Sequence, residues 1–88
     1  MQMADTIAAK LKSGLEPNFL EVLDVSHHHA GHAGWREGGG THFHVTIAAA
    51  AFRGKSRLQR HRLVNALLAE ELANGVHALE LHLSDDTP

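Results

Sequence analysis

Six of the nine histidines in this 88-residue chain lie between positions 26 and 44, in the segment SHHHAGHAGWREGGGTHFH. The chain contains no cysteine. A neutral imidazole is a good ligand for zinc, copper, nickel or iron, and histidine also titrates close to physiological pH. The segment therefore indicates a metal site or a proton-responsive loop. A purification tag is a poor explanation, because tags are placed at chain termini and this segment is internal.

Within this segment, His29 and His32 have the spacing H-x-x-H, which allows two rings to bind one metal ion. The usual signatures of a closed zinc site are absent from the sequence, which has no cysteines and no H-E-x-x-H motif. For His27 and His28, a solvated loop side chain is the simpler interpretation. Metal ligation and plain solvent exposure are therefore both open alternatives for the segment.

His77 lies apart from the other candidates, at the start of the stretch VHALELHL. By parity it belongs to the same side of a strand as the apolar residues Leu79, Leu81 and Leu83. On spacing alone, the simplest interpretation is a half-buried histidine that fills space.

Residues for catalysis are not evident. No serine, histidine and aspartate set is recognisable, and cysteine nucleophiles are excluded. The glycine run at 38–40 lacks the lysine and hydroxyl of a phosphate-binding loop. We therefore predict that the chain is not an enzyme.

Basic residues are concentrated in one segment, although the chain as a whole has a net charge of -2. No acidic residue occurs from position 38 to 69. Such a segment can contact phosphates, helped by the partial positive charge at the start of the following helix. It lacks the second glycine of the GXXG loop of KH domains, so a face for docking another protein is the alternative. The candidate residues are Arg53, Lys55, Arg57, Arg60 and Arg62.

The length predicts a single domain, and hydrophobic periodicity predicts its elements. We expect a helix over 4–15, strands over 19–25 and 42–49, a helix over 57–72 opened by a capping box from Ser56 to Gln59, and a strand over 76–83. The order α-β-β-α-β predicts an α+β fold, with a three-stranded sheet and helices on one face. The histidine- and glycine-rich segment 27–41 is expected to be a mobile loop, and 84–88 a short tail.

Four stretches carry a resemblance to a known family, in this order along the chain: SHHHAGH, THFHVTI, FRGKSRLQRHRLVNALLAEEL and VHALELHL. They resemble the BolA family, and the resemblance extends from about residue 5 to 83. The resemblance implies a single BolA-like domain over 1–88 with a fold similar to class II KH domains. It also implies a monothiol glutaredoxin as partner and a bridging [2Fe-2S] cluster, completed by glutathione and the glutaredoxin cysteine. The ligands from this chain would be His77 and a loop histidine, with His29 the best match and His32 the reserve. No cofactor is expected in the isolated protein.

A second role is implied by the same resemblance, because bacterial members are described as transcriptional regulators of cell shape and stress behaviour. DNA contact would use the basic turn and helix, whose residues we infer from charge and do not carry over from the family. The N-terminus has no recognisable signal peptide, and no apolar run approaches the roughly 20 residues that span a membrane. We therefore expect a cytoplasmic protein without membrane contact, either a monomer or a weak homodimer.

Overall fold

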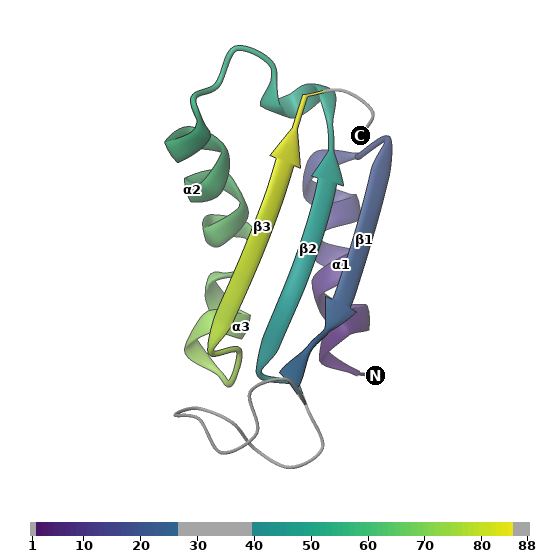
Figure 1. Ribbon diagram of the computed structural model, residues 1–88, viewed down its shortest axis with the longest axis vertical. Helices are drawn as coiled ribbons and strands as arrows, with labels where there is room; N and C mark the ends of the chain where they lie inside the picture. Colours follow the sequence, from purple (N-terminus) through teal and green to yellow (C-terminus); the bar gives the residue numbers. More distant parts are fainter. Residues whose placement is uncertain (1, 27–39, 86–88) are drawn as a thin grey trace.

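The computed structural model describes residues 2–26 and 40–85 as a three-stranded sheet with all its helices on one face (Figure 1). This confirms the predicted α+β fold. In chain order, the elements are α1 (Met3–Leu15), β1 (Phe19–Asp24), β2 (His42–Ala48), the 3₁₀ turn η2 (Ala50–Phe52), α2 (Arg57–Leu67), α3 (Ala69–Ala73) and β3 (Ala78–Ser84). In the described part of the chain, no helix has the length and apolar character needed to cross a membrane.

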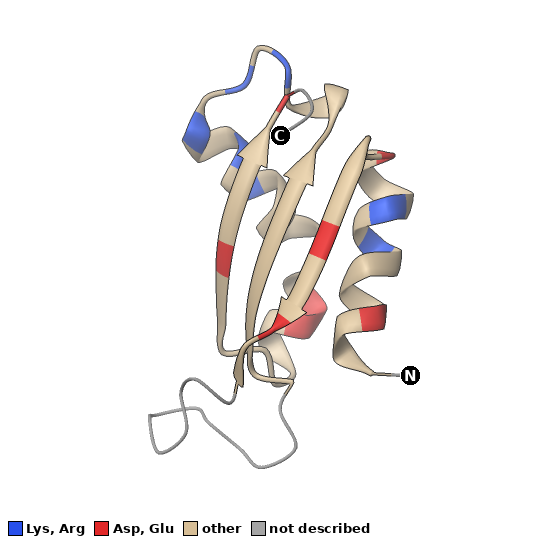
Figure 2. Ribbon diagram, turned by 45° about the vertical axis from the view of Figure 1, so that its right-hand side comes forward, with Lys and Arg blue, Asp and Glu red and all other residues tan. Residues whose placement is uncertain are grey.

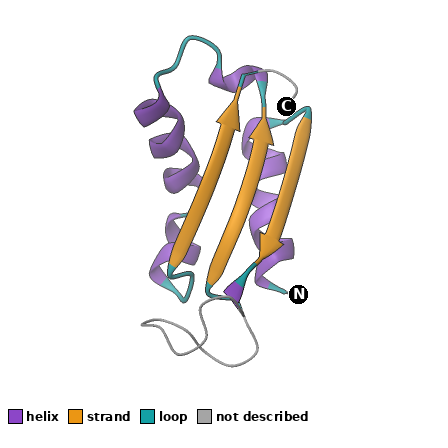
Figure 3. Cartoon of the chain, viewed as in Figure 1, coloured by secondary structure: helices purple, strands orange, loops and turns teal. Residues whose placement is uncertain are grey.

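The strands are ordered β1-β2-β3, with β1 and β2 antiparallel and β2 and β3 parallel (Figure 3). Alternate residues face the helices, and in β2 these are Phe43, Val45 and Ile47, all almost completely buried. None of the described helices lies against the other side of the sheet, which carries exposed side chains such as Phe19 and Leu23. The prediction of a sheet covered on one face is therefore confirmed.

The core joins this covered sheet face to α1, α2 and α3. Apolar residues at helical spacing supply one half of it, and alternating strand residues supply the other. Its buried members are Ile7, Leu11, Leu15, Phe43, Val45, Ile47, Ala49, Phe52, Val64, Leu68 and Val76.

The end of α1 at Leu15 agrees with the predicted helix over 4–15. The helix continues through Gly14, and Glu16 takes the left-handed conformation (φ 46°) with its N–H bonded to the Lys12 carbonyl. A Cβ atom at position 14 would lie 2.7 Å from Leu67 Cδ2. Gly14 is therefore explained by the close approach of α1 to α2, not by helix termination.

The predicted helix over 57–72 is divided at Leu68 into α2 and α3. Leu68 has φ -106° and ψ 16° and is completely buried. The Leu72 N–H still bonds to the Leu68 carbonyl, so the hydrogen bonding of the helix resumes directly after the break. The predicted capping box is present: Ser56 Oγ accepts from Gln59 N, and Gln59 Oε1 accepts from Ser56 N.

A buried carboxylate links α3 to α1. Glu71 is 4% exposed, and its Oε2 atom lies 2.6 Å from Lys10 Nζ. Its Oε1 atom has no hydrogen-bond partner among the described residues. Because a buried carboxylate needs compensation, Lys10 is expected to stabilise the contact between the two helices. The hydrogen bond to Glu71 raises the pKa of Lys10 above its ordinary value of 10.5.

We predict that Lys10→Met lowers the free energy of unfolding, and that the difference from wild type depends on pH. Since the folded protein holds the Lys10 proton more tightly than the unfolded chain, the stabilisation is fully present below pH 10.5 and is lost as the pH rises through the folded-state pKa. Denaturant titrations of both proteins should give a constant difference up to about pH 10 and a smaller one above. Lys12→Met, at an exposed position on the same helix, is the control. A difference that persists undiminished at higher pH would contradict the assignment.

Candidate functional site

The two ends of the histidine-rich segment are joined by a compact hydrogen-bond network. Asp24 Oδ1 accepts from Ser26 N (2.9 Å) and Ser26 Oγ (2.6 Å), while Asp24 Oδ2 accepts from Gly40 N (2.9 Å). Ser26 Oγ in turn accepts from the backbone N–H groups of Thr41 (3.0 Å) and His42 (3.1 Å). The segment therefore leaves and re-enters the sheet at one fixed place.

His77 is fixed to the same place through its backbone. Its N–H donates to the Thr41 carbonyl at 2.7 Å, and the Ala78 N–H donates to the same oxygen at 3.1 Å. The strand begins at Ala78, one residue later than His77, and the His77 side chain is exposed. The interpretation of His77 as a half-buried residue within a strand over 76–83 is therefore wrong.

His42 is a neighbour of His77 that the sequence did not single out. It is 5% exposed, its Nδ1 atom lies 2.8 Å from Thr41 Oγ1, and its ring centroid lies 5.6 Å from that of His77. Alternation along β2 placed it on the open side of the sheet, where a histidine is normally solvated. No local signal in the sequence indicated that it would be buried beside another imidazole.

The predicted loop ligands His29 and His32 lie outside the described residues, as does most of the predicted loop 27–41. The structure does place the described residues on either side, Ser26 and Gly40, in one network with Thr41, to which His77 is bonded. Both ends of the segment therefore lie beside His77, the member of the predicted ligand set that the structure describes.

The basic segment lies at the opposite end of the sheet, where β3 ends and α2 begins (Figure 2). β3 has seven residues, so about 20 Å separates its two ends. Lys and Arg residues gather on the turn before α2 and on its first turns (Figure 2). The two sets of predicted site residues therefore form two separate surfaces.

A pocket of about 610 Å³ opens between the start of α2 and the end of β3. Three of the five predicted basic residues line it, together with two histidines and two leucines. Arg53 and Arg62 do not line it. The lining residues are Thr46, Lys55, Arg57, Arg60, His61, Leu81, His82, Leu83 and Ser84.

The side chain of Arg60 has partners within the described part of the protein. Its Nε atom donates to the Lys55 carbonyl at 3.0 Å, and its guanidinium lies 3.8 Å from Asp85 Oδ2. Arg60 is therefore partly committed to holding the turn and the end of β3 together. Lys55 and Arg57, both exposed, have no ion pair within residues 2–26 and 40–85.

Comparison with known proteins decides the family. A family model described as BolA-like protein matches residues 11–87. The chain belongs to the BolA family. The BolA domain of SufE1 from Arabidopsis thaliana, a solved structure, superposes with a TM-score of 0.84 at 46% sequence identity, covering 92% of this chain and 88% of that one. The fold shown above is thus that of a BolA domain.

Two curated relatives show how BolA domains occur in different proteins. SufE-like protein 1 of A. thaliana is 49% identical over a 79-residue alignment, and the match covers 85% of this chain but only 21% of that protein. The relative named DNA-binding transcriptional regulator BolA, from Escherichia coli, is 42% identical over 82 residues, which make up 93% of this chain and 74% of that protein. The BolA-named relatives are named as regulators or as BolA-like proteins, not as enzymes.

Proposed function

We propose that this BolA protein is a non-enzymatic partner of a monothiol glutaredoxin and shares a bridging [2Fe-2S] cluster with it, in iron–sulfur trafficking or iron sensing. His77 would be one ligand and a histidine of the loop, His29 or His32, the other. The observation that carries the proposal is the position of His77: an exposed imidazole whose backbone is bonded to the residue at which the histidine-rich segment re-enters the sheet.

The chemistry of these residues fits such a cluster. An exposed imidazole on a fixed backbone can reach an iron held by a second protein, and the adjacent segment supplies further imidazoles without any cysteine. Replacing thiolate by neutral imidazole on one iron raises the reduction potential of a [2Fe-2S] cluster. Imidazole ligation is also lost when the ring is protonated. Both properties favour a cluster that is transferred or sensed over one that is permanently stored.

The identity of the loop ligand can be decided with single variants. We predict that either His29→Ala or His32→Ala abolishes the change in visible circular dichroism that occurs when the chain is added to cluster-loaded monothiol glutaredoxin. The other variant should keep that change, because one imidazole from the loop completes the pair with His77. Retention of the full change in both single variants and in the double variant would rule out both residues as the ligand.

A second candidate function, DNA binding, is favoured by the pocket at the other end of the sheet. Lys55 and Arg57 lie at the capped start of α2, where the helix adds partial positive charge. Leu81 and Leu83, which also line the pocket, offer apolar contact to a base or sugar beside the phosphate. The name of the E. coli relative is consistent with this proposal.

We predict that Lys55→Ala and Arg57→Ala each weaken binding to duplex DNA and flatten its salt dependence. Loss of one phosphate contact should reduce the slope of log affinity against log salt by about 0.9. Fluorescence anisotropy at several salt concentrations measures this slope, with Lys12→Ala on α1 as the control. Slopes equal to that of wild type in both variants would argue against phosphate contacts in the pocket.

A further inference from the structure

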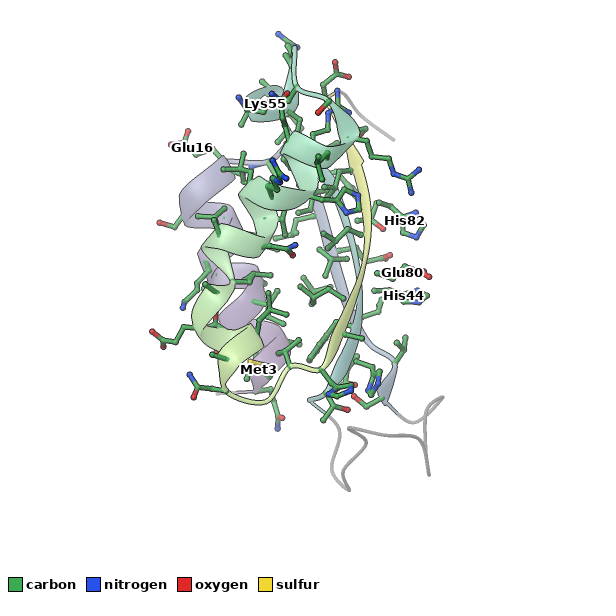
Figure 4. The ribbon with its side chains drawn as sticks, turned by 90° about the vertical axis from the view of Figure 1, so that its left-hand side faces the viewer. Met3, Glu16, His44, Lys55, Glu80 and His82 are labelled. Atoms are coloured by element: carbon green, nitrogen blue, oxygen red, sulfur yellow. The ribbon has the colours of Figure 1, made fainter. Side chains whose placement is uncertain are left out.

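Two histidines and a glutamate on the open face of the sheet are not among the proposed cluster ligands, although His82 also lines the pocket at the start of α2. His44 lies on β2, and Glu80 and His82 lie on β3. The parallel register places His44 directly opposite Glu80, with His82 two residues further along the same face. Figure 4 shows the three side chains projecting together from the sheet, on the side away from the helices.

The three groups already interact through one oxygen atom. His44 Nε2 lies 2.9 Å and His82 Nε2 lies 3.2 Å from Glu80 Oε2, and the two ring centroids are 6.4 Å apart. Between 44% and 62% of each side chain is exposed. Within the described ranges, Glu80 has no lysine or arginine as an ion-pair partner. The two imidazoles are therefore the groups that contact the Glu80 carboxylate.

We propose that His44, Glu80 and His82 bind a divalent transition-metal ion of the zinc, nickel or copper class. Two imidazole nitrogens and a carboxylate oxygen are a donor set that these ions take. The ion would take the place of the imidazole N–H protons that now face the carboxylate. Its two positive charges would then bind both imidazole nitrogens and the carboxylate oxygen. Because this face of the sheet is open, water can fill the remaining coordination positions.

Binding requires the side chains to turn. As they lie, no three histidine, aspartate or glutamate side chains in the described part of the chain surround a common point for a metal ion, because both rings are directed at the carboxylate oxygen itself. Exposed side chains change rotamer within nanoseconds, and the ring centroids of His44 and His82 already lie 6.4 Å apart. The strand pairing holds the backbone, so side-chain rotation is sufficient to bring the donors together.

The test must separate this site from the histidines of the loop, which would bind the same ions. We would use the full chain with asparagine at positions 27, 28, 29 and 32 and titrate it with Zn²⁺ by calorimetry. The expected result is one equivalent bound, with metal-induced shifts of the imidazole nitrogen resonances of His44 and His82. Loss of a residue that only supports a ligand costs about 10–100-fold in metal affinity, so loss of a ligand should cost at least about tenfold. That loss is expected in His44→Gln, Glu80→Gln and His82→Gln.

Glu21→Gln provides the matched control, because Glu21 is an exposed carboxylate on the same face of β1 and should leave Zn²⁺ affinity unchanged. All four substitutions are at exposed or largely exposed positions, so melting temperatures should stay close to that of the parent. Zn²⁺ affinity that is equal in parent, Glu80→Gln and His82→Gln would overturn the proposal. So would nitrogen shifts confined to His42 and His77.

Discussion

Substitution of His77 by alanine should remove most of the spectroscopic change seen when this BolA protein is mixed with cluster-loaded monothiol glutaredoxin. The reason is that His77 is the proposed ligand whose backbone is fixed, through its bond to the Thr41 carbonyl. A loop histidine alone would supply one donor and no second bond to the iron. Titrations followed by visible absorption and circular dichroism measure the effect.

The His77 result is informative because the residue contributes little to the fold. Its side chain is exposed, so His77→Ala should change the free energy of unfolding by no more than about 0.5 kcal/mol. His61→Ala, at the opposite end of the sheet, is a control that should keep the full spectral change. An unchanged spectrum in His77→Ala would show that the ligand assignment is wrong.

Ser26→Ala removes only one hydroxyl group but should strongly lower the free energy of unfolding. Ser26 is 1% exposed, and its Oγ atom is the acceptor for the N–H groups of Thr41 and His42, two buried residues. A buried donor left without an acceptor costs about 1–3 kcal/mol. Two such donors predict a loss of about 2–6 kcal/mol, measured by denaturant unfolding, with a fall in melting temperature of about 10 °C or more.

A serine on the surface provides the comparison. Ser13 is exposed on α1, and Ser13→Ala should stay within about 0.5 kcal/mol of wild type. If Ser26→Ala were equally mild, the network at the base of the loop would not have the structural role assigned to it. Glutaredoxin binding, measured on folded Ser26→Ala, tests whether cluster sharing depends on the hydrogen-bond network of Asp24 and Ser26.

The elements of the fold were predictable because their signals are local. Alternation along 42–48 and helical spacing of Val64 and Leu68 each reflect which side of one element faces the core. The capping box of Ser56 and Gln59 is likewise contained within four residues. Such features follow from the residue types themselves, and the structure confirms them.

Features that depend on distant residues were not predictable from these patterns. Glu71 belongs to a polar pair in an exposed-looking stretch, and its burial follows from contact with Lys10, sixty-one positions earlier in the chain. His42 is buried at the start of β2, where its backbone is bonded to Ser26 and its ring lies beside that of His77, a residue distant in the chain. The candidate site shows the same limit: the residues of the VHAL stretch were identifiable, but the proximity of His77 to both ends of the loop arises only from pairing between strands.

The most direct test of the central claim, that a His77 nitrogen binds an iron of a cluster shared with glutaredoxin, is pulsed electron paramagnetic resonance of the reduced complex. The chain would be labelled with ¹⁵N-histidine and compared with His77→Cys, in which a thiolate can still hold the iron. We predict couplings from two histidine nitrogens in the wild-type complex and from one in His77→Cys. A cluster without any histidine coupling, or with the same couplings in both proteins, would contradict the account.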